Sequence, residues 1–352
     1  MITWKRIGLK NLTFPKVEPY TKEYLANNEN LAEDVLLCKT NKNEVQKINN
    51  YKNYDDVQGL GKDFISYIEE FYNSGITLRL SKNTKLDDPI NIKFLLDYDN
   101  STLVDYNIII AEEGSEATII IDYTSDSSSN GFHNGLTKVY AKENSVINVI
   151  KLQRLNDKSQ SFDSNLAFVE GHGQVNWVSI ELGSDISGAN YTTYLDGEAS
   201  EGNLSSIYIG DGSRKLDLGY TMIHKGIRSI SNIESKGVLM DEAKKVFRGN
   251  LYFKQGSRLS KGSEEEYVIL LDPKVQSHSI PGLFCEEDDV QGAHAASAGQ
   301  LNKDKLFYLM SRGLSERQAK KMIIESSFRP IIDKIPLEDI RKKITDEIER
   351  RI

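Results

Sequence analysis

The sequence predicts a mainly β protein in which short strands stack as the coils of a solenoid, between an N-terminal α/β region and a C-terminal helical domain. Turn-like sites recur at intervals of about 29 residues, and a β-rich run precedes and follows each of them. Near Gly299 the hydrophobic pattern changes from strand-like to helical spacing. These observations divide the chain into residues 1–75, 76–300 and 301–352.

The N-terminal region is predicted to be partly helical. Apolar residues follow helical spacing in residues 29–40 and again in residues 55–75. Gly75 is expected to end the second helix, because glycine favours helix termination. The apolar residues that share one side of this helix are Phe64, Ile65, Ile68, Phe71 and Tyr72.

Residues 76–300 contain the repeat. Its turn-like sites are Glu113-Gly114-Ser115, Glu143-Asn144-Ser145, Gly171-His172-Gly173 and Glu201-Gly202-Asn203. One strand pair cannot bury its inward face alone, whereas stacked coils share a continuous core and leave their polar loops outside. A β-sandwich would also contain many short strands, but the near-constant interval favours a solenoid.

Alternation along each strand predicts which side chains share a face. Val175, Trp177, Ser179 and Glu181 fall on one face, and Asn176, Val178, Ile180 and Leu182 fall on the other. The first set is mixed in polarity. Ile180, and likewise Ile120 in an earlier coil, is therefore expected to point into the core.

The C-terminal region is predicted to hold three helices. Asn302 is a candidate N-cap of the first helix, and Gly313 is expected to stop it. Ser315 and Gln318 have the spacing of a capping box for the second, and Pro336 starts the third. The third helix carries an apolar stripe, which should cover either the end of the solenoid or a partner. The stripe consists of Leu337, Ile340, Ile344, Ile348 and Ile352.

Composition excludes several classes of function. The 44 basic and 52 acidic residues give a net charge of −8, which argues against a nucleic-acid binder. Two cysteines cannot form a disulfide framework or a four-cysteine metal site. No run of 18 apolar residues occurs, and the first residues lack the apolar segment of a signal peptide. We therefore expect a cytoplasmic protein that has no membrane partner.

The sequence contains no GxxxxGK[ST], HExxH, GxSxG or CxxC motif. We therefore expect a protein that is not an enzyme and that binds no nucleotide itself. His133, His172 and His278 are interpreted as polar turn residues, and His224 as a hydrogen-bonded residue of the core. His294 differs from these four, because only small residues flank it.

His294 also lies close in sequence to Asp288 and Asp289, and a carboxylate can orient an imidazole toward a metal. Cys285 is a second candidate ligand, since a thiolate suits iron. Against that role, Phe284 and Cys285 have the pattern of a buried strand end. Residue types alone leave both a structural and a metal-binding role open for His294.

Several stretches resemble the SufB/SufD family, the scaffold proteins of the SUF iron-sulfur cluster assembly system. The most specific are residues 224–253 and the C-terminal order of Asp288-Asp289-Val290, His294 among small residues, and LFYLMSRGLSERQA at 306–319. The opening TWKRIGLKNLTFP and the stretch ITLRLSKNTKLDDPINI are similar to the family's N-terminal segments. The spacing from Asp288 to His294 is most like that of SufD.

The resemblance implies a right-handed parallel β-helix that acts as a scaffold. It implies a SufB-like scaffold paired with the last coils, and SufC, an ATPase of the ABC type, docked on the C-terminal helices. His294 matches a family histidine that faces SufB and takes part in building a transient iron-sulfur cluster shared with the partner. Flavin binding stays open. The residues that match the family's helical docking signature are Phe307, Tyr308, Arg312 and Gly313.

Two departures from the family pattern qualify this reading. SufB-like members carry a sulfur-accepting cysteine upstream, but residues 260–275 contain none. Where SufD-like relatives often have Lys-Cys-Ser-His-Gly, this chain has Gln291-Gly292-Ala293-His294-Ala295. The first departure argues against a sulfur acceptor, and the second against a thiol beside His294. The alternatives are a self-pairing SufB-like scaffold, a β-helix carbohydrate-active enzyme and an adaptor without metal contact.

Overall fold

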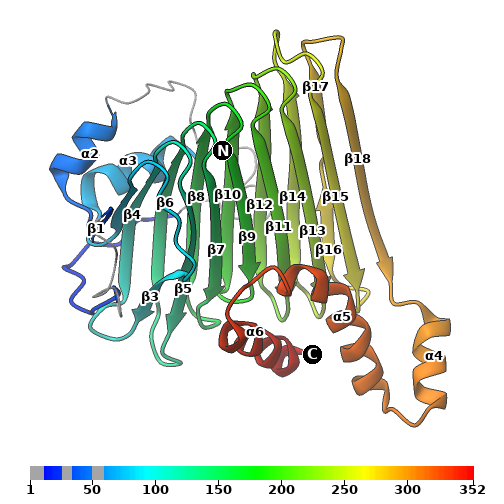
Figure 1. The fold of residues 1–352 in the computed structure, drawn as a ribbon. Helices are drawn as coiled ribbons and strands as arrows, with labels where there is room; N and C mark the ends of the chain where they lie inside the picture. The colour runs from blue at the N-terminus through cyan, green and yellow to red at the C-terminus, as the bar shows by residue number, and fades with distance from the viewer. Residues whose placement is uncertain (1–11, 26–33, 50–58) are drawn as a thin grey trace.

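The computed structural model describes residues 12–25, 34–49 and 59–352, and its centre is a solenoid of two facing sheets (Figure 1). The larger sheet contains β1 (Val35–Lys39), β2 (Ile76–Leu80), β4 (Thr102–Ala111), β6 (Phe132–Ala141), β8 (Gln160–Val169), β10 (Ile186–Leu195), β12 (Lys215–His224), β14 (Lys244–Phe253), β16 (Gln276–Ser279) and β17 (Gly282–Cys285). The smaller sheet contains β3 (Ile90–Leu96), β5 (Glu116–Ser125), β7 (Val146–Arg154), β9 (Gln174–Glu181), β11 (Glu201–Gly210), β13 (Ile230–Leu239), β15 (Lys261–Leu270) and β18 (Gln291–Gln300). Apart from β1 the strands pair in parallel, so the predicted β-solenoid is confirmed.

Successive coils stack in register. Ile186 of β10 pairs with Gln160 of β8 on one side and with Lys215 of β12 on the other. Paired residues of parallel strands point to the same side of the sheet. Side chains at equivalent positions of successive coils therefore form columns, and each column lies either inside the solenoid or outside it.

The short turns that lead from the larger to the smaller sheet form a second stack. Gly114, Asn144 and His172 have φ angles of 70°, 58° and 55°. Each donates its backbone N–H to a carbonyl of the next coil, at 2.8 to 3.0 Å. The first three predicted turn sites are thus confirmed. The fourth was placed too late, because the left-handed residue of that turn is Ala199 and β11 already begins at Glu201.

The assignment of inward and outward faces was wrong. Val175 and Trp177 lie in the apolar core between the two sheets. Ile120 and Ile180 are fully buried, but they belong to a separate cluster together with residues of the C-terminal helices. The outward face of the smaller sheet is apolar where the helices cover it, and the interior also contains buried polar side chains such as Ser179 and Glu181.

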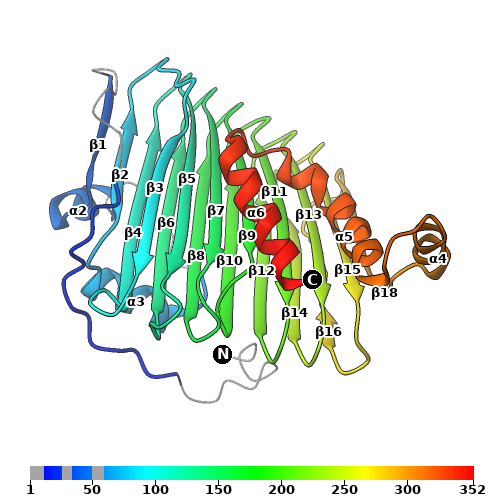
Figure 2. The same ribbon diagram turned by 90° about the horizontal axis from the view of Figure 1, so that it is seen from below.

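The C-terminal helices are α4 (Lys303–Ser311), α5 (Glu316–Ile332) and α6 (Glu338–Arg351). Both α5 and α6 lie across the outer face of the smaller sheet, whereas α4 projects beyond β18 (Figures 1 and 2). The isoleucine stripe of α6 therefore covers the flank of the solenoid, which neither predicted alternative described. Its buried members are Ile340, Ile344 and Ile348.

Side-chain capping fixes the starts of two of these helices. The Asn302 side chain accepts a hydrogen bond from the backbone N–H of Lys305 at 2.9 Å. The predicted capping box of Ser315 and Gln318 is present at the start of α5. Gly313, with a φ of 98°, follows α4 as predicted.

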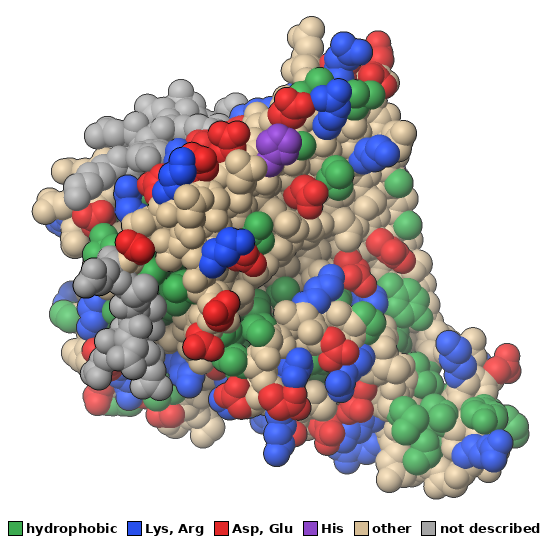
Figure 3. Space-filling model, in the orientation of Figure 1, with side chains coloured by type: hydrophobic (Ala, Val, Ile, Leu, Met, Phe, Trp, Pro, Cys, Tyr) green, Lys and Arg blue, Asp and Glu red, His purple; other side chains and the backbone are tan. Residues whose placement is uncertain are grey.

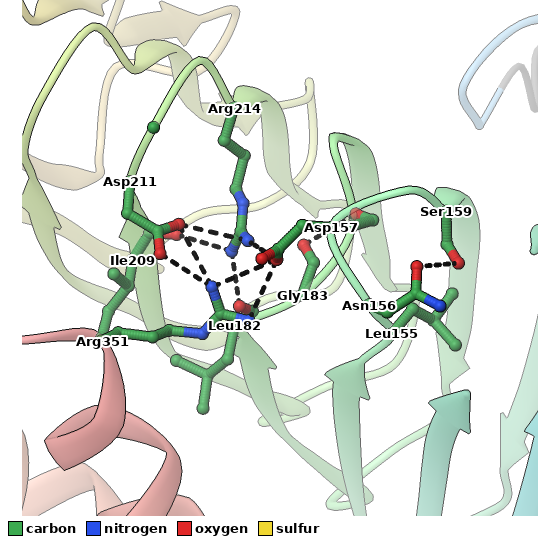
Figure 4. A network of polar contacts seen from close by, with 12 residues as sticks. Leu155, Asn156, Asp157, Ser159, Leu182, Gly183, Ile209, Asp211, Arg214 and Arg351 are labelled. Carbon is green, nitrogen blue, oxygen red and sulfur yellow. Dashed lines mark hydrogen bonds and ion pairs between the residues drawn. The ribbon is translucent and has the colours of Figure 1, made fainter. Parts of the chain in front are cut away.

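An ionic cluster attaches the last turn of α6 to the corners of the coils (Figure 4). The Arg351 guanidinium donates to the Asp211 carboxylate at 2.9 Å, and that of Arg214 donates to Asp157 at 2.6 Å. Both arginine side chains are almost completely buried. Paired carboxylates offset the cost of burying these charges, and the cluster defines where α6 ends on the solenoid.

The described N-terminal residues include α2 (Lys42–Asn49) and α3 (Lys62–Phe71). Helix α3 covers the outer face of the larger sheet with Phe64 and Ile68. The helix expected at residues 29–40 is corrected in part: residues 35–39 form β1, antiparallel to β2, and residues 29–33 lie outside the described residues. Gly75 has a φ of 132°, and a Cβ there would lie 2.1 Å from the Tyr106 carbonyl oxygen.

The first coil is capped by the residues that precede it. Strand β1 pairs with the edge of β2, and residues 20–25 run along β3. Tyr24 is 3 % exposed, packs on Phe94 at a ring distance of 4.8 Å, and donates its hydroxyl to the Gly75 carbonyl at 3.0 Å. The N-terminal end of the solenoid core is therefore closed.

Ile180→Asp should lower the free energy of unfolding by about 3 kcal/mol or more, because a carboxylate would be buried under the helices without a partner. The measurement is urea unfolding followed by β circular dichroism. Tyr98→Asp is the matched control, since Tyr98 is 89 % exposed. Equal urea midpoints for the two variants would contradict the packing of the helices on this face.

Candidate functional site

The last coil ends the solenoid without a cap in the part of the chain that the structure describes. We call β16, β17 and β18 the open coil end. β18 pairs with β15 on one side, and among the described residues no strand pairs with its other side. Nine of its ten residues are exposed, and most of them are small. Leu283 and Phe284 of β17 are 37 % and 46 % exposed.

His294 belongs to a column that points into the solenoid. It pairs in register with Glu264, which pairs in turn with Ile233. The complete column, from the first coil to the last, is Ile90, Ile119, Val149, Trp177, Leu204, Ile233, Glu264 and His294. Because no further coil lies beyond β18 among the described residues, His294 faces inward and is nevertheless exposed.

Cys285 ends an inward column on the opposite sheet. It pairs with Phe253, which is buried in the core and stacks on His224. Its neighbour Phe284 points outward and stacks on Tyr252 at 4.4 Å. Both Phe284 and Cys285 are exposed, so the buried strand end that their pattern predicted is wrong. The structure thus places Cys285 and His294 on the inward faces of the two sheets at the open coil end.

Glu264, rather than either predicted aspartate, is the carboxylate next to His294 in the column. Asp289 lies in the loop before β18 and forms an ion pair with Arg258 at 3.8 Å. Glu264 is 2 % exposed, and neither of its carboxylate oxygens has a hydrogen-bond partner among the described residues. Burial, followed by repulsion from Glu266, raises the pKa of Glu264 to about 7.

Helix α4 presents an apolar surface next to the open coil end. None of its residues is buried, and Phe307 and Tyr308 are 74 % and 56 % exposed. Hydrophobic side chains gather on this projecting helix in Figure 3. The Arg312 guanidinium lies over the Tyr308 ring at 5.4 Å, and Gly313 begins the turn to α5. All four residues of the predicted docking signature are therefore on the surface.

A family model described as "SUF system FeS cluster assembly, SufBD core domain" matches residues 94–327, about two thirds of the chain. The chain belongs to the SufBD family. The predicted resemblance to SufB and SufD is confirmed, and this family functions in iron-sulfur cluster assembly by the SUF system. Membership favours the scaffold over the carbohydrate-active alternative.

Among curated relatives, the chain is 25% identical to the iron-sulfur cluster assembly protein SufD of Bacillus subtilis over 282 residues. It is 26% identical over 285 residues to a SufBD family protein of Staphylococcus epidermidis, and 27% to one of Staphylococcus saprophyticus. These matches cover 80% of this chain, 64% of the Bacillus protein and 61% of the two staphylococcal ones. The chain thus spans less than two thirds of the length of these relatives.

Two interior histidines of this SufBD-family chain have structural partners. His133 was predicted to be solvated, but it is fully buried and contacts Asp105 at 2.8 Å and Ser161 at 2.9 Å. The two ring nitrogens of His224 are hydrogen-bonded to the hydroxyls of Ser229 and Ser231, at 2.7 and 2.8 Å. The prediction of a hydrogen-bonded core residue is therefore confirmed. Burial lowers the pKa of His224 to about 4, so this imidazole is neutral at pH 7.

Glu264 is the site residue that the sequence reasoning missed. The run Glu264-Glu265-Glu266 contains the signal, because alternation must turn two of three consecutive glutamates to the same side. The described residues contain no group of three or more histidine, cysteine, aspartate and glutamate side chains placed to hold a metal ion. Within the same residues, no helix combines the length and hydrophobicity of a membrane span.

Proposed function

We propose that this chain is a non-catalytic scaffold subunit of a SUF complex, which pairs with a SufB-like scaffold through the open coil end and docks a SufC-like ABC ATPase through α4. The observation that carries the proposal is the asymmetry of the solenoid. Residues 20–25 and β1 close the first coil, whereas β18 leaves the last coil exposed. Solenoids need a cap at each end, and a partner subunit supplies the second one here.

The chemistry of β18 supports pairing with another strand. Its free edge presents a row of backbone donors and acceptors, which is a template for strand addition. Its alanines and glycines allow a second backbone to approach closely. A partner that ends in the same kind of coil would also continue the inward columns. A SufB-like member of the same family meets that requirement, and a second copy of this chain is the alternative outcome.

Pairing would enclose the space into which His294 and Cys285 point. An imidazole and a thiolate are both suitable ligands for iron, and the partner would contribute the remaining ligands. The cluster is a transient cargo in this proposal and not a resident cofactor. The nucleotide is bound by the ATPase subunit.

Helix α4 is suited to transmit movement of an ATPase to the pairing surface. β18 ends at Gln300 and α4 begins at Lys303, so a short connection joins the pairing strand to the docking helix. On its other side, α4 packs on α5, which contacts β11 and β13. A shift of α4 would therefore be carried into the last coils.

Phe307→Glu should weaken binding of the SufC-like ATPase at least tenfold, because a central exposed aromatic residue would be replaced by a charge. The melting temperature should stay unchanged, since Phe307 is largely exposed. Binding is measured by surface plasmon resonance with the ATPase from the same organism. Phe71→Glu, at an exposed phenylalanine of α3, is the matched control. Normal binding by the Phe307 variant would place the docking surface elsewhere.

His294→Ala should sharply reduce cluster accumulation on the assembled complex, while melting temperature and partner binding stay close to those of the wild type. The exposed imidazole supports no packing, so its loss removes only a ligand. Cluster formation is followed by visible absorbance, with His172→Ala as the control at another exposed histidine. Cys285→Ser should have a smaller effect. Unfolding of the His294 variant, or normal cluster formation on it, would return His294 to a structural role.

A further inference from the structure

The inward column that ends in His294 changes from apolar to polar side chains in its last two coils. Its first six members are all apolar, and each is buried. Glu264 and His294 then follow in direct succession. A solenoid gains stability by stacking like side chains in its interior, so a carboxylate above Ile233 contributes nothing to that packing.

Glu264 is buried without the partners that a structural carboxylate has. Glu266, two residues later on the same inward face, accepts hydrogen bonds from Lys245 at 2.6 Å and from Tyr208 at 2.7 Å. Lys245 also donates a hydrogen bond to the Ser279 hydroxyl at 3.1 Å, and among the described residues it donates none to Glu264. Burial of an unpaired carboxylate is unfavourable. Residues that break this packing rule are typical of functional sites, where the cost is offset by binding a ligand.

The fold reserves space for this carboxylate. Gly249 of β14 lies across the interior from Glu264, and a Cβ at Gly249 would lie 2.5 Å from the Glu264 Cγ and 2.9 Å from its Oε1. The residues that precede Gly249 in its column are the large aromatics Tyr191 and Tyr220. Glycine replaces an aromatic ring at the level where the glutamate projects inward.

Glu264 and His294 are suitably placed to share one ion. Paired residues of adjacent parallel strands lie about 4.8 Å apart, and their side chains point the same way. A metal bound to a carboxylate oxygen and an imidazole nitrogen needs about 2.0 to 2.2 Å to each. Ala296, two residues after His294 on the inward face, has a small side chain that leaves room for the ion and for further ligands, whereas the Leu283 side chain lies against Gly292.

We propose that Glu264 and His294 form an iron-loading pair, in which the Glu264 carboxylate and the His294 imidazole bind Fe²⁺ at the open coil end. This inference rests on the proposed function and names the place where iron enters the assembly. A carboxylate and an imidazole suit divalent first-row cations such as Fe²⁺ and Co²⁺. The bound ion supplies the positive charge that the buried carboxylate lacks, and its open positions accept sulfide and ligands from the partner.

The test uses the full chain without partners and Co²⁺ as the probe, because Co²⁺ is stable in air and its visible absorbance reports coordination. The wild type should bind one Co²⁺. Glu264→Gln and His294→Ala should each weaken binding at least tenfold. Glu265→Gln is the matched control, since Glu265 is exposed on the opposite face of the same strand. Anaerobic titration with Fe²⁺ should rank the four proteins in the same order.

Thermal unfolding separates a ligand from a structural residue. Without metal, Glu264→Gln should melt at the wild-type temperature or above it, because an unpaired buried charge has been removed. Co²⁺ should raise the melting temperature of the wild type but not that of this variant. Wild-type Co²⁺ affinity in Glu264→Gln, a lower melting temperature of the metal-free variant, or no Co²⁺ binding by the wild type would each overturn the inference. Failure of partner pairing would refute the proposed function alone, since this assay contains no partner.

Discussion

The register between successive coils is the constraint on which the rest of this structure depends. Each strand must place its side chains above those of the strand before it, so a residue's surroundings are set by its counterparts about 29 residues away. In a stack of this kind, every coil except the first and the last has a neighbour on both sides, which pairs with its strand edges and packs on its side chains. Residues before β2 close the first coil. Within the described part of the chain, the last coil has a free strand edge and inward side chains that face solvent. The candidate site residues His294 and Cys285 lie at that end, where the outer edge of β18 is unpaired among the described residues.

The interior of the solenoid also contains ionic groups, and most of them are paired. Lys151 contacts Asp163 at 2.7 Å, and Lys245 contacts Glu266 at 2.6 Å, with all four side chains buried. Such pairs roughly balance the cost of burial, so they position side chains more than they stabilise the fold. Glu264 contrasts with them, because it lies next to the open end without a hydrogen-bonded partner among the described residues. This contrast with the paired interior groups is the basis for proposing Glu264 as a metal ligand.

Periodicity and local residue types predicted the repeat, three of its four turn sites and the N-caps of α4 and α5, because these features depend on nearby residues. It could not predict that α5 and α6 cover the outer face of the smaller sheet, and it therefore placed Ile180 on the wrong side. The burial of His133 depended on Asp105, one coil earlier, which no local pattern reveals. Residue types singled out His294 and Cys285 as candidate ligands, and the family motif supported His294. Glu264 could be identified as a site residue only from the register between β15 and β18, because it lies 30 residues before His294 in the sequence.

Amide hydrogen exchange of β18, with and without the SufB-like partner, tests the central claim most directly. If the open coil end is the pairing surface, the backbone amides of Gln291–Gln300 that face the free edge should exchange at least tenfold more slowly in the complex. Amides of the buried strand β8 should exchange at the same rate in both states. A stable complex in which β18 exchanges as fast as in the free chain would contradict this account.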